Sequence, residues 1–123
     1  MARILVADDE DDIRLIIRIL LTRSGFEVTE ARDGMQAWLS ATANPPDMAI
    51  FDIRMPHLSG LEALEKLKAD PATAQFPVLI VSAYVQETEI RRGKELGAVG
   101  YLTKPFQPAN LLARVNEILA AAR

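Results

Sequence analysis

Carboxylate side chains follow two of the apolar segments in this 123-residue sequence. Asp8 and Asp9 come directly after the run Ile4–Ala7. Asp52 follows the run Met48–Phe51. Carboxylates that converge repel one another unless a cation lies among them, and Mg²⁺ is a hard cation that prefers oxygen ligands. Because a carboxylate can also attack a phosphoryl group, these residues are candidates for a metal-assisted phosphoryl-transfer site.

A hydroxyl group and an ammonium group follow two later apolar segments. Ser82 comes directly after Val78–Val81. Lys104 comes after Val99–Leu102, with Thr103 between them. In an open parallel α/β sheet, ligands bind beyond the carboxyl ends of the strands. If these segments are parallel strands, the ammonium and the hydroxyl meet the carboxylates at one edge, where both can interact with phosphoryl oxygens.

The apolar periodicity alternates between strand-like and helix-like segments, and this predicts the elements that position these residues. Strand patterns cover residues 4–7, 26–30, 48–51, 78–81 and 99–102. Helix patterns cover residues 13–21, 33–44, 59–69, 86–96 and 111–119. Such alternation is typical of βαβ units with right-handed crossovers. We therefore expect one α/β domain over residues 1–123, a five-stranded parallel sheet flanked by five helices, and no output domain in this chain.

The predicted helices differ in how well their apolar residues line up. The first helix has one inward stripe, formed by Ile13, Ile16, Ile17, Leu20 and Leu21. Ser59 and Glu62 fit a capping box at the start of the third helix. The fourth helix has the poorest apolar stripe and an internal glycine, Gly93, which disfavours helix. We expect this fourth helix to be among the less stable elements.

The charge of the chain is concentrated in one place. The sequence has 17 acidic and 14 basic residues and a net charge of −3, and five of the acidic residues form the run 8–12. This balance argues against a protein that coats nucleic acid, so no direct nucleic-acid contact is expected. Within the run, Asp11 and Asp12 are interpreted as residues that start the first helix.

Two further features of the composition restrict the class of protein. The chain has no cysteine, which excludes disulfides, zinc–thiolate sites and thiol nucleophiles. The N-terminus lacks the pattern of a signal peptide, and the apolar stretches are too short to span a bilayer. We expect a cytoplasmic protein without membrane insertion.

Four short segments follow one another in a specific order and spacing. They are Ile4–Glu10, Phe51–Pro56 followed by Ser59 and Gly60, Val81–Ala83, and Gly100–Phe106. In these segments the sequence resembles the receiver domain of two-component response regulators, and the resemblance covers nearly the whole chain. It implies a flavodoxin-like sheet with strand order 2-1-3-4-5. It also implies a cis peptide bond between Lys104 and Pro105.

The resemblance implies roles for individual residues. Asp52 would accept a phosphoryl group from a histidine kinase or a histidine phosphotransfer protein. Asp9, Asp52 and the backbone carbonyl of Arg54 would ligate Mg²⁺, or Mn²⁺ in its place, and Asp8 would act on the metal mainly through a bound water. Lys104 would pair with the phosphoryl oxygens.

The family's function is a phosphorylation-dependent signalling switch and not a turnover enzyme. Ser82 would move toward the phosphoryl group, and Tyr101 would swing inward behind it, although Tyr101 can also be interpreted as a plain core aromatic. The changed surface would control a downstream effector that the sequence does not name. We expect a monomer that can dimerise when phosphorylated, with partner contacts near the acidic edge, the first helix and the surface of the fourth helix, fifth strand and fifth helix.

Three positions depart from the family pattern or tune it. His57 stands where most relatives have glycine, so we expect a slightly different loop geometry. Arg54 and Tyr84 occupy positions that tune self-dephosphorylation in the family. Because both are bulky and could hinder the attacking water, we expect a comparatively long-lived phosphorylated form.

Three alternative functions fit the sequence less well than the receiver interpretation does. A phosphohydrolase of the haloacid dehalogenase type needs a second aspartate two residues after the nucleophile, where this chain has Arg54. A flavin-binding protein needs a hydroxyl- or glycine-rich phosphate loop after the first strand, where this chain has an acidic run. An adaptor domain that has lost phosphorylation is not supported, because no switch residue is missing.

Overall fold

One parallel sheet organises the described part of the chain, residues 1–83 and 86–122 of a computed structural model. Its strands are β1 (Arg3–Ala7), β2 (Glu27–Ala31), β3 (Met48–Phe51), β4 (Val78–Ser82) and β5 (Gly100–Thr103). All neighbouring strands are parallel, and their order is β2-β1-β3-β4-β5. The predicted fold class and strand order are confirmed.

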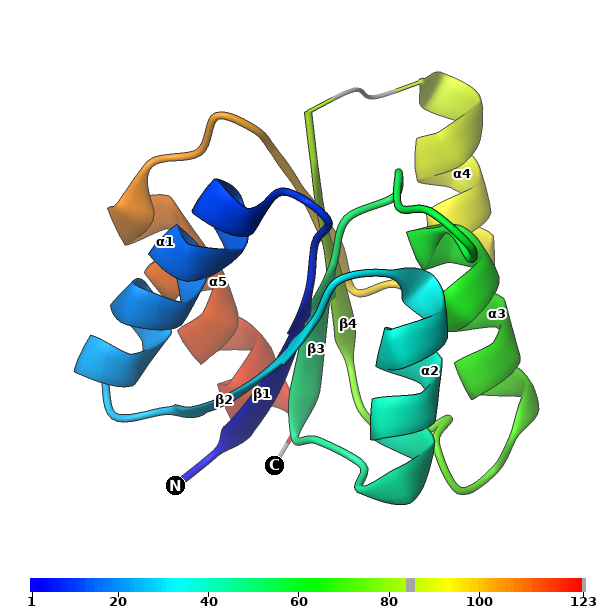
Figure 1. Ribbon diagram of the computed structural model, residues 1–123, viewed down its shortest axis with the longest axis horizontal. Helices are drawn as coiled ribbons and strands as arrows, with labels where there is room; N and C mark the ends of the chain where they lie inside the picture. Colours follow the sequence, from blue (N-terminus) through cyan, green and yellow to red (C-terminus); the bar gives the residue numbers. More distant parts are fainter. Residues whose placement is uncertain (84–85, 123) are drawn as a thin grey trace.

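Helices cover both faces of this sheet (Figure 1). They are α1 (Asp11–Arg23), α2 (Gly34–Ala43), α3 (Gly60–Ala69), α4 (Glu87–Glu95) and α5 (Pro108–Ala121). Helices α1 and α5 lie on one face, and α2, α3 and α4 lie on the other. Strand side chains alternate between the faces, so Ile4 and Val6 pack on the α1 side while Leu5 and Ala7 pack on the α2 side. No helix within the described ranges has the length and apolar character needed to cross a membrane.

Two glycines bring the N-termini of α2 and α3 against the loop after β3. A Cβ atom on Gly34 would lie 2.0 Å from the main-chain oxygen of Leu58. A Cβ atom on Gly60 would lie 2.0 Å from the main-chain oxygen of Asp52. Only glycine permits these contacts, so the two helix starts fix the path of the loop that begins at Asp52.

The starts of α2 and α3 are also capped by side chains. The side chain of Asp33 accepts a hydrogen bond from the backbone N–H of Gln36 at 2.7 Å. At α3 the predicted capping box between Ser59 and Glu62 is present. Hydrogen bonds from Ser59 lower the pKa of Glu62 below its ordinary value. The caps therefore supply partners for helix N–H groups that would otherwise have none.

The face that α1 turns toward the sheet differs from the predicted one only at Ile16, since Ile13, Ile17, Leu20 and Leu21 pack on it as predicted. Ile17 and Leu21 are buried, but Ile16 is 45 % exposed. The prediction that Ile16 belongs to the inward stripe is therefore wrong. At about 3.6 residues per turn, Arg14 lies closer than Ile16 to the centre of the stripe formed by Ile17 and Leu21. Arg14 is accordingly buried on this helix.

Helix α4 packs loosely on the sheet. Gly93 is its one buried residue, and a cavity of about 80 Å³ beneath the helix is lined by residues that include Ile90 and Tyr101. A Cβ atom on Gly93 would lie 3.6 Å from Leu61 Cδ2 and 3.9 Å from Ala98 Cβ, which are ordinary contacts. The space around Gly93 thus admits a methyl group.

Replacing Gly93 with alanine is expected to raise the free energy of unfolding by up to about 1 kcal/mol, because alanine is the better helix former and its methyl group fits. Denaturant-induced unfolding of both proteins measures this change. Gly34→Ala is the opposite control, since its methyl group would collide with the Leu58 carbonyl. A lower stability of Gly93→Ala would show that the space beneath α4 is needed by the folded state.

Candidate functional site

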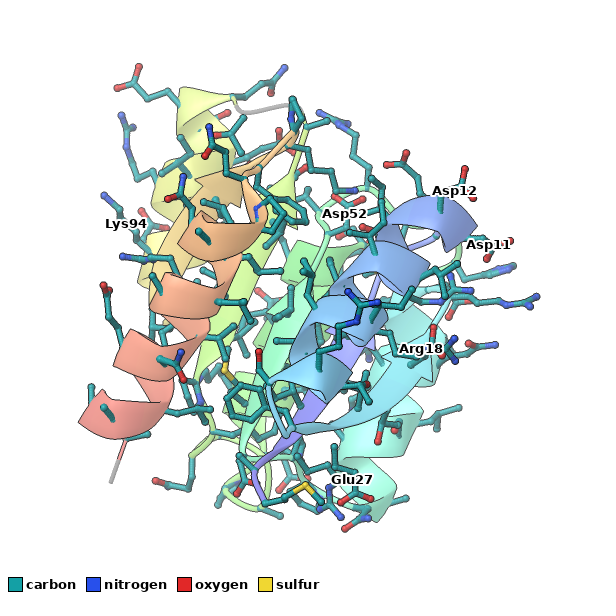
Figure 2. The ribbon with its side chains drawn as sticks, turned by 90° about the vertical axis from the view of Figure 1, so that its left-hand side faces the viewer. Asp11, Asp12, Arg18, Glu27, Asp52 and Lys94 are labelled. Carbon is teal, nitrogen blue, oxygen red and sulfur yellow. The ribbon has the colours of Figure 1, made fainter. Side chains whose placement is uncertain are left out.

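Asp52, the central residue of the predicted site, directly follows β3. The strand register places Ala7 opposite Phe51. Asp8 and Asp52 are the next residues after these two neighbouring strands, so they lie side by side at the edge of the sheet. The backbone N–H of Asp52 donates to the carbonyl of Ala7 at 3.0 Å. The Asp52 residue is buried. Figure 2 shows Asp52 at the end of the sheet where α1 begins.

The ammonium group of Lys104 lies among three carboxylates. Its Nζ atom is 2.7 Å from Asp8 Oδ2, 2.9 Å from Glu10 Oε1 and 3.1 Å from Asp52 Oδ2. The Lys104 side chain is only 6 % exposed. We refer to Asp8, Glu10 and Asp52 as the acidic cluster. The structure therefore joins the ends of β1, β3 and β5, as the positions of these residues after their strands predict.

The charges of this site are strongly coupled. Burial disfavours the charged form of Lys104, but hydrogen bonds to Asp8 and Glu10 and the charge of Asp52 outweigh it and raise the pKa of Lys104 above its ordinary value. Burial raises the pKa of Asp8, and the hydrogen bond with Lys104 opposes that rise. A buried ammonium paired in this way stays protonated, so the site retains a cation for an incoming anion.

The acidic cluster also has the donor chemistry of a divalent cation site. One carboxylate oxygen from each of its three residues lies within 4.8 Å of the others. Mg²⁺ is bound in proteins through carboxylates and substrate phosphate and keeps several waters. Three closely spaced carboxylate oxygens at a solvent-accessible edge therefore fit Mg²⁺ or Mn²⁺.

The predicted metal ligand Asp9 lies beside the acidic cluster and not within it. Its side chain is exposed and lines a surface hollow of about 260 Å³ together with Glu10, Asp52, Arg54 and Ser82. An exposed carboxylate at this position can reach a ligand bound in the hollow. The role of the main-chain carbonyl of Arg54 as a metal ligand stays a prediction.

The remainder of the acidic run points away from the site. Asp11 and Asp12 are exposed and project from the start of α1 away from Asp52 (Figure 2). Both belong to the first turn of the helix, where carboxylates interact favourably with its N-terminus. Asp11 also pairs with Arg14 at 2.6 Å. These positions agree with the interpretation of Asp11 and Asp12 as helix-starting residues.

The two predicted switch residues touch each other. Ser82 is buried at the end of β4, and Tyr101 is half-buried on β5. Burial raises the pKa of the Tyr101 hydroxyl, and a hydrogen bond with the Ser82 side chain opposes that rise. The carbonyl of Ser82 accepts a hydrogen bond from the backbone N–H of Lys104 at 3.0 Å. The Lys104–Pro105 peptide bond is cis, as the resemblance implies.

Arg54 connects the loop after β3 with helix α4. Its Nη2 atom lies 3.2 Å from Glu89 Oε1, and its side chain is 57 % exposed. The ion pair therefore connects Arg54, two positions after Asp52, to the loosely packed helix α4. Tyr84, the other position expected to affect dephosphorylation, lies outside the described residues.

His57 has a backbone conformation that usually favours glycine. Its φ angle is 67°, in the left-handed region. The expected difference in loop geometry from relatives that have glycine at this position stays a prediction. Non-glycine residues in this region are uncommon and carry some strain.

Two residues of the site were missed in the sequence. Glu10 was treated as part of the acidic run, although it contacts Lys104 and completes the acidic cluster. Arg14 has no predicted role, because an arginine beside an apolar helical stripe normally lies at its exposed edge. For Glu10 the only signal is its place next to Asp8 and Asp9; for Arg14 we find none.

Comparison with known proteins identifies relatives of this chain. The profile of the family described as response regulator receiver domain matches residues 4–116. Protein PilH of Pseudomonas aeruginosa is 38 % identical over 120 residues, which are 98 % of this chain and 99 % of PilH. The receiver domain of sensor histidine kinase PA1611 from Pseudomonas aeruginosa, solved with a magnesium ion coordinated in its active-site cleft, superposes with a TM-score of 0.89 at 27 % identity and covers 97 % of this chain and 98 % of that one.

Other relatives are longer than this chain. The alkaline phosphatase synthesis transcriptional regulatory protein PhoP of Bacillus subtilis is 39 % identical over 117 residues, which are 95 % of this chain and 48 % of PhoP. The chain thus spans about half the length of PhoP and of several other curated relatives it matches.

Proposed function

Because the chain belongs to the response regulator receiver domain family, we propose that it is a phosphorylation-dependent switch of a two-component system in which Asp52 accepts the phosphoryl group. Receiver domains are phosphoacceptor switches and not conventional enzymes. The observation that carries the proposal is the contact of the Lys104 ammonium with the acidic cluster. It supports a site where a nucleophilic carboxylate lies beside a cation that can bind phosphoryl oxygens.

The proposed phosphodonor is a phosphohistidine on a histidine kinase or a histidine phosphotransfer protein. A carboxylate oxygen of Asp52 attacks phosphorus and forms an acyl phosphate. The phosphorus–nitrogen bond breaks, and the leaving imidazole keeps the bonding electron pair. Lys104, already within 3.1 Å of Asp52, binds an oxygen of the transferring group and stabilises the charge that it carries.

The proposed metal site consists of Asp8, Asp9, Asp52 and the main-chain carbonyl of Arg54, with Asp8 acting mainly through a bound water. A bound Mg²⁺ or Mn²⁺ supplies positive charge that offsets the repulsion between the carboxylates and an incoming phosphoryl group. The short spacing between carboxylate oxygens of Asp8 and Asp52 supports the part of this assignment that concerns these two residues. Glu10, which contacts Lys104, is placed to hold the ammonium in position.

The proposed switch begins at the contact between Ser82 and Tyr101. After phosphorylation the Ser82 hydroxyl turns toward a phosphoryl oxygen, and Tyr101 moves inward behind it. The loose packing of α4 and its link to Arg54 through Glu89 support a response of this helix. The receiver would occupy residues 1–123, act in the cytoplasm as a monomer that can dimerise when phosphorylated, and control an effector still to be identified.

Incubation with acetyl phosphate, a small phosphodonor, tests the proposed function. With Mg²⁺ present, intact-mass measurement is expected to detect one phosphoryl group on the wild-type chain. The same incubation with a chelator in excess over Mg²⁺ is expected to give almost none. Absence of the adduct with Mg²⁺, or equal labelling in the two samples, would contradict the proposal.

Asp9→Ala is expected to abolish Mg²⁺ binding while leaving the stability of the fold unchanged, because the Asp9 side chain is exposed and lines the proposed site. Isothermal titration calorimetry with Mg²⁺ and thermal unfolding measure the two quantities. Asp12→Ala, in the same acidic run but directed away from Asp52, is the matched control. Undiminished affinity of Asp9→Ala would remove Asp9 from the metal site.

Arg54→Ala is expected to shorten the lifetime of the phosphorylated form several-fold, because a smaller side chain gives water freer access to the acyl phosphate. The decay of the adduct after removal of the phosphodonor, without any phosphatase, measures the lifetime. Glu89→Gln is the control, since it disrupts the pair with Arg54 and keeps the arginine. Rapid loss of phosphate from the wild type, or equal lifetimes of wild type and Arg54→Ala, would contradict the expected long-lived form.

A further inference from the structure

Arg14 is a buried cation that the proposed reaction does not use. Its side chain is 9 % exposed, although it belongs to α1 on the outside of the sheet. Burying a guanidinium group is unfavourable unless it is paired and hydrogen-bonded. The hydrogen-bond partners of Arg14 therefore indicate which part of the structure this side chain holds in place.

Three groups from three parts of the chain bind the Arg14 guanidinium. Its Nη1 atom donates to the main-chain carbonyl of Asp8 at 2.8 Å. Its Nε atom donates to Glu30 Oε1 at 3.0 Å, and its Nη2 atom donates to Asp11 Oδ1 at 2.6 Å. Asp8 directly follows β1, Asp11 starts α1 and Glu30 belongs to β2. The planar fork of donors in arginine suits such a three-way contact.

With the Arg14 contact, the main chain and the side chain of Asp8 both have hydrogen-bond partners. Its backbone N–H donates to the carbonyl of Ala31 at 3.1 Å, and its carbonyl accepts from Arg14. Its side chain accepts from the backbone N–H of Glu10 at 2.9 Å and pairs with Lys104 at 2.7 Å. Both main-chain polar groups of Asp8 are thus held, one by β2 and the other by the Arg14 side chain. Arg14 itself touches none of the carboxylate oxygens of the acidic cluster in these contacts.

We propose that Arg14 is a positioning residue of the divalent-cation site: it binds the Asp8 carbonyl and thereby fixes the turn from β1 to α1 that carries Asp8, Asp9 and Glu10. This inference rests on the proposed metal site. Without the Arg14 side chain, the Asp8 carbonyl loses its hydrogen bond and the turn loses its connection to Glu30, so the carboxylates must be ordered when the cation binds. The affinity for Mg²⁺ falls accordingly.

A purely electrostatic role of Arg14 predicts the opposite sign. Arg14 is a positive charge close to carboxylates, so its removal makes the site more negative and strengthens the attraction for Mg²⁺. A purely structural role predicts lower stability with an unchanged Mg²⁺ affinity of the folded protein. The direction of the change in affinity therefore distinguishes the three roles.

The test compares wild type, Arg14→Gln, Arg14→Lys and Arg18→Gln by isothermal titration calorimetry with Mg²⁺, well below the unfolding temperature of each protein. Arg18→Gln is the matched control: it removes the same charge one turn away, from a side chain that is 48 % exposed and contacts Glu30 at 3.3 Å. We expect Arg14→Gln to bind Mg²⁺ about 10-fold more weakly and Arg18→Gln to bind like wild type. Arg14→Lys, which keeps a donor for the Asp8 carbonyl, should fall between wild type and Arg14→Gln.

Hydrogen exchange at the backbone amide of Glu10 gives a second readout. It should be faster in Arg14→Gln than in Arg18→Gln, because the turn that holds this amide is released. Equal or tighter Mg²⁺ binding by folded Arg14→Gln would overturn the inference and leave the metal site standing. If Arg14→Gln does not fold, wild-type affinity in Arg14→Lys overturns the inference. Absence of Mg²⁺ binding by the wild type would overturn the proposed metal site itself.

Discussion

Asp52→Asn is expected to lose phosphorylation by acetyl phosphate completely, which is the largest effect that we predict. The carboxamide is neutral and cannot supply the anionic oxygen that attacks phosphorus. The shape of the side chain is kept, and Lys104 retains its contacts with Asp8 and Glu10, so the fold should be maintained. Intact-mass measurement after incubation with Mg²⁺ and the phosphodonor detects the loss.

Asp12→Asn provides the control for this substitution. It makes the same chemical change on an exposed residue of the acidic run that points away from the site. It should be phosphorylated like the wild type. Equal labelling of Asp52→Asn and wild type would show that another residue accepts the phosphoryl group.

Lys104→Met is expected to slow phosphorylation by a factor of about 10²–10³, which is typical for removal of one group that stabilises charge in a transition state. The methionine preserves much of the apolar side chain and removes the ammonium that contacts Asp52. The same substitution is expected to strengthen Mg²⁺ binding, because the acidic cluster loses the cation that now lies among its oxygens. The two quantities therefore change in opposite directions.

A phosphorylation time course and Mg²⁺ titration calorimetry measure these two effects of Lys104→Met. Lys94→Met is the control, because Lys94 is exposed on α4, well away from Asp52 (Figure 2). If Lys104→Met is phosphorylated at the wild-type rate, Lys104 has no part in binding the transferring group. If its Mg²⁺ affinity is unchanged, the ammonium and the metal do not compete for the acidic cluster.

The sequence predicted the site residues that directly follow buried strands. Asp8, Asp52 and Lys104 each follow a strand and Ser82 is the last residue of one, and parallel strands bring such positions to the same edge of a sheet. Alternation of strands and helices leaves the strand order open, however. The order came only from the resemblance of whole segments to receiver domains, and the structure confirms it.

The residues that the sequence did not identify depend on the rotation of α1. A polar run followed by an apolar stripe does not determine whether Glu10 turns toward Lys104 or toward solvent. For the same reason the apolar pattern favours Ile16 over Arg14 as an inward residue, whereas in the structure Arg14 is buried and Ile16 is exposed. Burial of Arg14 is possible only because Asp8, Asp11 and Glu30 converge on it, and that convergence is a property of the tertiary fold.

Borohydride reduction of the phosphorylated wild-type chain tests the central claim most directly. Borohydride converts the acyl phosphate of an aspartate to the alcohol of homoserine, and tandem mass spectrometry of the digested protein locates the converted residue. Phosphorylation of Asp52 predicts homoserine at position 52 and an unmodified aspartate at positions 8 and 9. Conversion at position 8 or 9, or a phosphorylated chain without conversion at position 52, would contradict it.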